Sequence, residues 1–301
     1  MLISIVTPSF RNSNWLKLCI ASVADQEGVE VEHIVQDAGS DDGTLDWLPH
    51  DRRVKAYVES DAGMYDAVNR GLRKSGGEIL AYLNCDEQYL PGALQGVHDY
   101  FTAHPEIEVA VAHTVIVDAR GQFICYRKAI VPRKHHILVC HLATLTCATF
   151  FRRRVMDQYG LLFDSRWRAL GDADWMVRLL ESRVRLGVLP RYTSVFADTG
   201  ENMGMEPNAH RERQEMFRAA PFWAQKLTLG LHATHWTRRL LHGNYCQRPF
   251  SYAIYTLDSP TQRIEHYVSH PTFLWKERLQ QGVLSTAKMS WGTRSGRPRA
   301  K

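Results

Sequence analysis

The chain has 301 residues, of which 45% are hydrophobic and 23% charged, and its net charge is +5 at pH 7. These are ordinary globular values, and the length allows one large α/β domain with an appendage. The charge excess lies in residues 288–301, which carry five basic residues and no acid. Because residues 1–287 are balanced, a nucleic-acid-binding protein is disfavoured, and we expect the basic tail to be disordered.

The sequence shows no targeting or membrane-spanning segment. The apolar start, residues 2–6, lacks the charged region and the length of a signal peptide. No apolar run approaches the ~20 residues of a spanning helix. The six cysteines contain no CxxC pair, which favours reduced, packed thiols. We therefore expect a cytoplasmic protein.

Strands and helices alternate along the first hundred residues. Apolar strands are predicted at 2–7, 31–35, 54–58 and 79–83, and helices after Asn12 or Ser13, near 45–48 and over 64–74. This alternation with short loops predicts a parallel sheet covered on both faces. Beyond residue 105 we expect a strand in mixed pairing over 109–117, a strand within 147–154, a helix within 163–180, and a strand pair around Pro190.

Polar and acidic residues follow the predicted strands at their carboxyl ends. They are Thr7-Pro8-Ser9, Asp37, Glu59-Ser60-Asp61 and Asn84-Cys85-Asp86-Glu87. Ligands of such sheets bind beyond these ends, so we expect the four groups to converge. The acidic loop at 84–87 could hold a divalent metal, because hard cations prefer oxygen ligands; a solvated turn or a helix cap is the alternative. No GxGxxG follows the first strand, which disfavours an NAD-binding fold.

Four motifs together resemble the family 2 glycosyltransferases. They are ISIVTPSFRN, EHIVQDAGSDDGT, ESDAGMYDAVNRGLRKSGGEILAYLNCDE and FFRRRVMDQYGLLFDSRWRALGDADWMVRLL. The block from Asp61 to Gly71 further resembles the subgroup that builds bacterial surface polysaccharides. The resemblance covers about residues 2–215. It implies the GT-A fold, a Rossmann-like mixed and mostly parallel sheet flanked by helices.

The resemblance also implies an activity and a division of the chain. The activity is transfer of a sugar, with inversion, from a nucleotide-diphosphate donor to a hydroxyl of a glycan or lipid-linked acceptor; a UDP-sugar is the expected donor. Residues 1–104 would form the nucleotide-sugar half and residues 105–215 the acceptor half. Residues 216–287 are expected to form a mainly helical extension before the tail at 288–301.

Several donor-binding residues are carried over from the family. Thr7 and Pro8 would line the base and ribose, and Asp37 would accept hydrogen bonds from the base. For Asp37 the alternative is an Asx turn before Gly39. The remaining candidates on this side, which resemble the family's donor-side helix, are Asp61, Asp66 and Asn69. Asn69 could instead be an exposed helix residue.

The family's D-x-D motif appears here as Asn84-Cys85-Asp86, a departure in which the first acid is an amide. Asp86 would then provide the main contact to a divalent metal, Mn²⁺ or Mg²⁺, with Glu87 as a substitute ligand. Asn84 would bind a ribose hydroxyl. Cys85 lies within the same nucleotide-sugar loop; it could be a soft metal ligand or simply a small packed side chain.

Asp172, in the segment ALGDADW, matches the acid that the family uses as catalytic base. The alternative for Asp172 is a helix N-cap. We assign capping to Asp174 instead. The preceding residue is often acidic in the family and is Gly171 here, which is a further departure.

Residues 216–257 contain no Asp or Glu but include five Arg or Lys residues and several aromatic and leucine residues. Such a stretch suits the surface of an anionic membrane, here the inner face of the cell membrane. Packing on the main domain or on a partner subunit is the alternative.

Two other functions compete with catalysis of sugar transfer. A non-catalytic sugar-nucleotide-binding or scaffold subunit is suggested by Asn84 in place of an acid. A nucleotidyltransferase is disfavoured, because no Gly/Arg-rich triphosphate loop follows the first strand.

Overall fold

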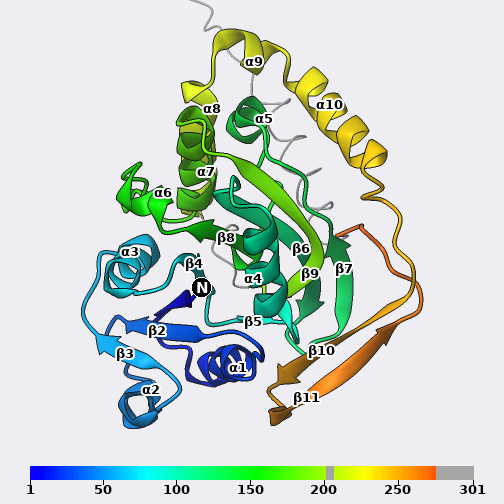
Figure 1. Cartoon of the computed structure of the whole chain (residues 1–301). Helices are drawn as coiled ribbons and strands as arrows, with labels where there is room; N and C mark the ends of the chain where they lie inside the picture. The colour runs from blue at the N-terminus through cyan, green and yellow to red at the C-terminus, as the bar shows by residue number, and fades with distance from the viewer. Residues whose placement is uncertain (201–206, 276–301) are drawn as a thin grey trace, which may run out of the picture.

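The computed structural model describes residues 1–200 and 207–275, and the predicted disordered tail lies outside them. Figure 1 shows a central sheet with helices on both sides. Its described strands run in the order β3-β2-β1-β4-β8-β6-β9-β5, with β7 paired to β6. Their bounds are β1 Ile3–Ser9, β2 Val31–Asp37, β3 Lys55–Val58, β4 Ile79–Tyr82, β5 Glu87–Tyr89, β6 Val109–Asp118, β7 Phe123–Arg127, β8 Thr149–Arg152 and β9 Leu186–Asp198.

The pairing directions confirm a mixed, mostly parallel sheet. Strands β1 to β4 are mutually parallel, and β6 pairs with β9 in parallel. Strand β8 is antiparallel to both β4 and β6, while β5 and β7 are antiparallel to β9 and β6. Because the parallel strands share one direction, their carboxyl ends form a single edge of the sheet, as expected.

Helices cover both faces of the sheet. Their bounds are α1 Ser13–Ala24, α2 Thr44–Trp47, α3 Met64–Lys74, α4 Ala93–Ala103, α5 Lys134–Val139, α6 Arg154–Asp157, α7 Gly171–Glu181, α8 Pro207–Ala219, α9 Phe222–Lys226 and α10 Thr228–Leu241. Ile5 faces a core shared with α1 and α4, whereas the next residue, Val6, faces a core shared with α3 and α7. This alternation is the period-2 geometry of a strand buried on both faces.

Glycine allows α3 to lie close to β1. A Cβ atom at Gly71 would come within 2.4 Å of the Cγ1 atom of Val6. The close approach places residues 61–65, which lead into α3, beside the carboxyl ends of β1 and β4.

The predicted strand pair around Pro190 is wrong, because Leu186–Asp198 forms the single strand β9. Leu189 pairs with Ala112 and Tyr192 pairs with His113, so two residues of β9, including Pro190, lie at a register shift. A bulge of this kind accepts a proline, which cannot donate a ladder hydrogen bond.

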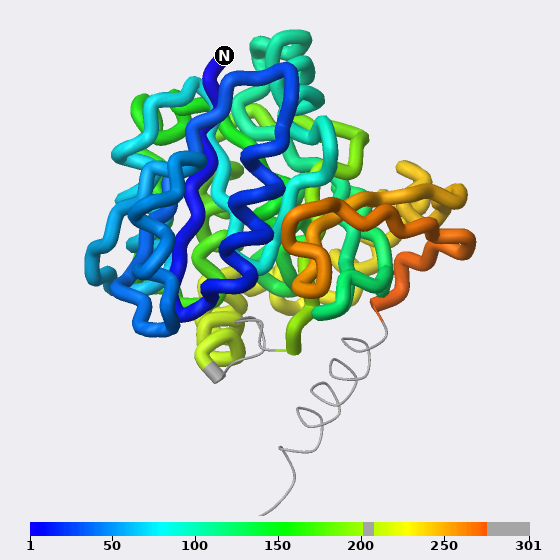
Figure 2. Tube along the Cα trace, turned by 90° about the horizontal axis from the view of Figure 1, so that it is seen from below, coloured from blue at the N-terminus to red at the C-terminus, as the bar shows by residue number. Residues whose placement is uncertain are grey.

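The described part of the extension, residues 216–275, contains the end of α8, the expected helices α9 and α10, and an unanticipated hairpin, β10 Phe250–Thr256 and β11 Ser259–Val268. Figure 2 shows this hairpin beside α1. Arg263 of β11 forms an ion pair with Asp25 at the end of α1, with Nε and Oδ2 2.6 Å apart. Within the described residues, none of the helices combines the length and the apolar character that crossing a bilayer demands.

Candidate active site

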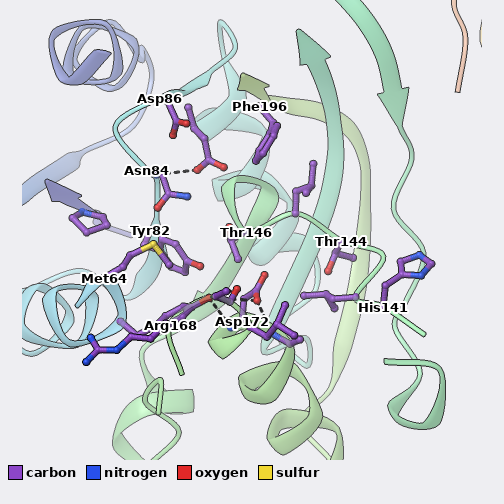
Figure 3. Close-up of a pocket in the computed structure, with 18 of the residues that line it drawn as sticks. Met64, Tyr82, Asn84, Asp86, His141, Thr144, Thr146, Arg168, Asp172 and Phe196 are labelled. Atoms are coloured by element: carbon purple, nitrogen blue, oxygen red, sulfur yellow. Dashed lines mark hydrogen bonds between the residues drawn. The ribbon is translucent and has the colours of Figure 1, made fainter. Parts of the chain in front are cut away.

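A cleft of about 1670 Å³ lies along the carboxyl edge of the sheet. It exceeds the ~300–1,000 Å³ of a pocket for one small molecule, so it has room for a donor and an acceptor together. Six predicted site residues line it: Pro8, Asp61, Asn84, Cys85, Asp86 and Asp172. Figure 3 shows Asp86 after β4 and Asp172 at the start of α7 around the same hollow.

The loop after β4 presents a group of oxygen atoms around Asp86. The Asn84 backbone N–H donates to Oε2 of Glu87 over 2.9 Å, which folds the loop back on itself. Oδ1 of Asn84 and Oε1 of Glu87 are buried and accept no hydrogen bond from the described residues. Burial raises the pKa of Asp86 and of Glu87, and for Glu87 the nearby Asp86 charge adds to it.

This donor set fits a divalent cation. An amide oxygen and a carboxylate oxygen that are both buried without a partner, beside the second carboxylate of Asp86, are costly unless a cation or a ligand satisfies them. Asp86 would hold the ion, with Glu87 and Asn84 supplying further hard oxygen ligands. The amide at position 84 therefore leaves the loop capable of binding a metal.

Cys85 is a packed thiol. Its side chain is buried, and its S–H group donates to the carbonyl oxygen of Pro8 over 3.0 Å. Burial raises the pKa of the thiol well above its ordinary value, so the thiolate that a metal needs is disfavoured. Cys85 thus joins the acidic loop to the end of β1.

Asp172 lines the cleft from the first turn of α7. Its Oδ1 accepts hydrogen bonds from the Ala173 N–H, over 2.8 Å, and from the Tyr65 hydroxyl, over 3.4 Å. Burial raises the pKa of Asp172 to about 6. A carboxylate with a pKa near neutrality is suited to act as a general base.

Tyr65 explains the glycine before Asp172. A Cβ atom at Gly171 would lie 2.6 Å from the ring of Tyr65, so the tyrosine occupies the space that a larger residue would need. The tyrosine hydroxyl also accepts a hydrogen bond from the Asp172 N–H, over 3.2 Å. Sequence reasoning missed this contact, which joins residues 107 positions apart.

The prediction that Asp174 caps α7 is wrong, because no side chain caps this helix and Asp174 pairs with Arg178 over 2.8 Å. The loop before α7 is held by Glu212 of α8 instead. This buried carboxylate accepts hydrogen bonds of 2.7–2.9 Å from three successive backbone N–H groups, those of residues 168–170. The one feature of the sequence that could have drawn attention to Glu212 is that this acid lies between two arginines, Arg211 and Arg213.

Replacing Glu212 by alanine is expected to lower both stability and turnover. Three buried N–H groups would lose their acceptor, so we expect a loss of about 3 kcal/mol in urea unfolding. The loop that positions Asp172 would also loosen, and kcat should fall at least about tenfold. Glu215→Ala on the same helix removes an exposed acid and is the matched control. Equal effects of the two substitutions would contradict this role.

Two predicted donor-binding residues do not line the cleft. Thr7 faces the α1 side of β1, opposite to Pro8, and its hydroxyl lies 2.9 Å from Nε2 of His33. The carboxylate of Asp37 is fully buried and accepts hydrogen bonds from Ser9 and from the N–H groups of residues 39 and 40. This is the Asx-turn alternative.

Asp66 and Asn69, on α3, also lie outside the cleft lining. Asp66 accepts a hydrogen bond from the Ala62 N–H over 3.0 Å and pairs with Arg70. Asn69 is buried, not exposed, and exchanges two hydrogen bonds with the backbone of Phe163. Both side chains fix the position of α3. Only Asp61 of this group lines the cleft, and its donor contact stays a prediction.

The wall of the cleft that residues beyond 120 form is basic and aromatic. It is built from β7, α8, α10 and the segment after the hairpin. Its basic and aromatic residues are Arg127, Arg213, Trp236, Arg239, Tyr245, Phe273 and Trp275. Arginine guanidinium groups and aromatic faces are the side chains that bind anionic groups and sugar rings.

Histidines gather where α5 meets α10. His136, His141 and His235 bring ring nitrogens within 4.8 Å of one another. Burial is the main cause that lowers the pKa of His136 and His235, to about 4 and about 3, and the charge of Arg238 contributes to both shifts. Because this neighbourhood is already cationic, a divalent ion is electrostatically disfavoured, and we assign none to the cluster.

The sequence matches a family model over about its first half and relatives over up to two thirds of its length. The family model described as Glycosyl transferase family 2 matches residues 4–160. A PGL/p-HBAD biosynthesis glycosyltransferase of Mycobacterium tuberculosis is 26% identical over 210 residues, 67% of this chain and 77% of the relative. A Bacillus subtilis protein named for teichuronic acid biosynthesis, TuaG, is 31% identical over 99 residues, 31% of this chain and 39% of the relative.

Solved structures share the fold. Staphylococcus aureus TarS 1–349 in complex with UDP-GlcNAc aligns with a TM-score of 0.58 at 16% identity, covering 78% of this chain and 73% of TarS 1–349. The chain spans 44% of the longer TarS structure. The mannosyltransferase PcManGT of Pyrobaculum calidifontis, in complex with GDP-Man and Mn²⁺, aligns with a TM-score of 0.53 at 16% identity. The alignment covers 80% of this chain and 78% of PcManGT. The expected GT-A fold is thereby confirmed.

Proposed function

The chain belongs to glycosyl transferase family 2, and from this membership and its cleft we propose that it is an inverting glycosyltransferase acting in surface polysaccharide synthesis. It moves a sugar from a nucleotide-diphosphate donor to a hydroxyl of a glycan or lipid-linked acceptor. Residues 1–104 hold the donor and residues 105–215 the acceptor. The observation that carries the proposal is that Asp86 and Asp172, which are 86 positions apart in the sequence, line one cleft.

The donor diphosphate lies against the loop after β4. Asp86, with Glu87 and Asn84, would hold Mn²⁺ or Mg²⁺ there, and the bound ion would neutralise the leaving diphosphate as a Lewis acid. The buried orphan oxygens of Asn84 and Glu87 support this placement. Asp61 and Pro8 line the same part of the cleft and contact the nucleoside or the sugar.

Asp172 takes the proton of the acceptor hydroxyl. The hydroxyl oxygen attacks the anomeric carbon as the bond to the diphosphate oxygen breaks, and the nucleoside diphosphate leaves with the bonding electrons. Attack from the face opposite the leaving group inverts the anomeric configuration. The Tyr65 hydroxyl and the Ala173 N–H both contact Oδ1, which fixes the carboxylate orientation.

A UDP-sugar is our proposed donor, and the relatives support a role in polysaccharide assembly. TarS, which shares the fold, is described in complex with UDP-GlcNAc, and a relative is named for teichuronic acid biosynthesis. GDP-mannose is the alternative, because PcManGT is described with GDP-Man. The base contact that we expected from Asp37 does not support either choice, because its carboxylate is occupied by Ser9, Gly39 and Ser40.

The function is tested by product analysis. The purified chain with Mn²⁺ and a panel of UDP-sugars and GDP-mannose should release nucleoside diphosphate, slowly to water and faster with an acceptor. The released or transferred sugar should show an inverted anomeric proton coupling in the NMR spectrum. Donor binding with no release at any metal concentration would favour the non-catalytic subunit, and release of pyrophosphate would favour a nucleotidyltransferase.

We further propose that α10 contacts the inner face of the cell membrane, which is anionic. Leu229 and Leu240 lie at helical spacing on one side of α10 and are 84% and 64% exposed. Residues 216–257 carry five basic residues and no acid. Another side of α10 packs on α5 of the main domain, and an exposed apolar stripe with basic neighbours suits the surface of an anionic membrane.

Vesicle sedimentation tests the membrane contact. The chain should bind vesicles that contain about 30% phosphatidylglycerol and release at high salt, because surface charge attraction is screened. Leu229→Glu with Leu240→Glu should reduce binding at least about tenfold without lowering thermal stability, since both side chains are exposed. Unchanged binding of this variant, or equal binding to neutral vesicles, would exclude the contact.

A further inference from the structure

Arg239 carries an unsatisfied charge into the cleft. It lies on α10 and lines the basic and aromatic wall of the cleft. Its Nε and Nη2 atoms are buried and donate no hydrogen bond to the described residues. The guanidinium carbon lies 5.1 Å from the ring centre of Tyr245, so the side chain is held over an aromatic face.

The surroundings make this charge costly in the free protein. Burial, followed by repulsion from Arg127, lowers the pKa of Arg239. No carboxylate of the described residues forms an ion pair with it. Asp198, an acid on this side of the molecule, accepts a hydrogen bond of 2.7 Å from the Trp275 indole instead. A half-buried cation whose Nε and Nη2 donors are buried without a partner carries a desolvation penalty unless a ligand supplies the counter-charge.

A second arginine reinforces the site. Arg127, at the end of β7, also lines the cleft, and its Nη1 donates to the carbonyl oxygen of Phe273 over 3.2 Å. Its guanidinium carbon lies 5.5 Å from the ring centre of Trp275. Both arginines are therefore oriented by aromatic rings and share one wall. Such an arrangement is preorganised for an oxyanion, because a guanidinium fork matches phosphate and carboxylate geometry.

We propose that Arg239 and Arg127 form an anion-binding site on the acceptor side of the cleft, which takes a phosphate or carboxylate group of the acceptor. The inference rests on the proposed function and narrows its substrate class to acceptors that carry an oxyanion near the reacting hydroxyl. The phosphate of a lipid carrier and the carboxylate of an acidic sugar share this chemistry. Neutral glycans lack the group that offsets the half-buried charge.

The position of the site separates it from the donor. The nucleotide half supplies the loop after β4, whereas Arg127 lies on β7 and Arg239 on α10, beyond residue 105 in both cases. The donor diphosphate would already be neutralised at Asp86. The two arginines therefore remain for a second anion, and occupying the donor site should not compete with it.

Binding measurements on the donor-saturated chain test the site. The chain is held with excess UDP and Mn²⁺ and titrated with dihexanoyl phosphatidic acid, trigalacturonate or neutral maltotriose, with tryptophan fluorescence as the readout. At least one anionic probe should bind, and maltotriose should bind at least about tenfold more weakly. Arg239→Gln and Arg127→Gln should each raise Kd for that probe at least about tenfold. Arg238→Gln, the adjacent residue on α10, should change Kd less than about twofold.

Stability and donor hydrolysis provide independent readouts. Without an anion, Arg239→Gln should unfold at the same or a higher temperature than the parent chain, because it removes a half-buried charge whose Nε and Nη2 donors have no partner among the described residues. A lower unfolding temperature would indicate a structural arginine and overturn the proposal. So would equal binding of all three probes, unchanged Kd in Arg239→Gln, or weaker UDP binding in that variant. Hydrolysis of the donor by Arg239→Gln tests the proposed function separately, since water needs no anion site.

Discussion

Replacing Asp172 by asparagine is expected to reduce kcat by about 10²–10⁴-fold while leaving donor affinity within about twofold. The amide cannot accept the proton of the attacking hydroxyl, but it keeps the shape of the side chain and its contacts with Tyr65 and Ala173. In our proposal the donor binds at the loop after β4, which the substitution does not touch. Steady-state release of nucleoside diphosphate, with donor binding measured by calorimetry, gives both quantities.

Asp174→Asn is the matched control for this prediction. Asp174 lies on the same helix, two residues further along, and its carboxylate pairs with Arg178. Losing that i,i+4 pair should cost about 0.3–0.5 kcal/mol of stability and leave kcat within about threefold. Loss of donor binding in Asp172→Asn, or an equal loss of kcat in both variants, would rule out the base role of Asp172.

The pH profile follows from the same carboxylate. Asp172 must be ionised to act as a base, and burial raises its pKa to about 6. We therefore expect kcat/KM of the free enzyme to be level above about pH 7 and to fall about tenfold per unit below pH 6. In Asp172→Asn the residual rate should lose this acid limb, which a pH–rate series from 5 to 8 would detect.

As the pH rises, the contribution of Asp172 to folding stability should fall while activity increases. The folded-state pKa of Asp172 lies above its ordinary value of 3.8, so the folded protein loses stability as pH rises from about 4 through about 6. At pH 7.5 the asparagine variant should be more stable than the parent, by at most about 3 kcal/mol. The difference should close as the pH approaches 4, as urea unfolding at both pH values would show.

Replacing Asp86 by alanine is expected to weaken metal-dependent donor binding at least about 100-fold, because even groups that only orient a metal ligand contribute 10–100-fold. Asp86 lines the cleft beside the orphan oxygens of Asn84 and Glu87, so it is the central ligand of our proposed metal site. Chelation by EDTA should have a similar effect on the parent chain and little further effect on the variant. Calorimetric titration with UDP, with and without Mn²⁺, measures both.

Asp41→Ala is the control for Asp86. Asp41 also lies in an acidic loop after a strand, but it forms a surface pair with Arg11 outside the cleft lining. Its removal should leave metal and donor affinity within about twofold, because an exposed pair contributes little. If the parent binds UDP equally with Mn²⁺ and with EDTA, the metal role of Asp86 is wrong.

Much of the fold could be predicted because it depends on local pattern. The helix over 64–74 matches α3 residue for residue, and the apolar runs before Pro8, Asp37 and Asn84 became adjacent parallel strands. Strand direction then required their carboxyl ends to meet. This is why Pro8 and Asp86 could be assigned to one edge of the sheet from the strand pattern, whereas Asp172, at the start of α7, was assigned to the same cleft through the resemblance to the family.

The candidate donor residues that do not line the cleft are side chains whose position depends on tertiary contacts. Thr7 and Pro8 are neighbours in the sequence, but strand alternation turns them to opposite faces of β1. Asp37 matches a motif, yet Ser9, Gly39 and Ser40 already occupy its carboxylate. Conversely, Tyr65 and Glu212 bind backbone groups more than 40 residues away in the sequence. Arg239 is notable because two of its donor atoms have no partner among the described residues. Long-range contacts and missing partners leave no periodic pattern in the sequence.

A crystal structure of the chain with Mn²⁺ and a non-hydrolysable UDP-sugar tests the central claim most directly. We predict the diphosphate and the metal against Asp86, with the face of the anomeric carbon opposite the leaving group turned toward Asp172 across the cleft. A donor seated away from Asp86, or an anomeric carbon that Asp172 cannot approach from that face, would contradict the proposed mechanism.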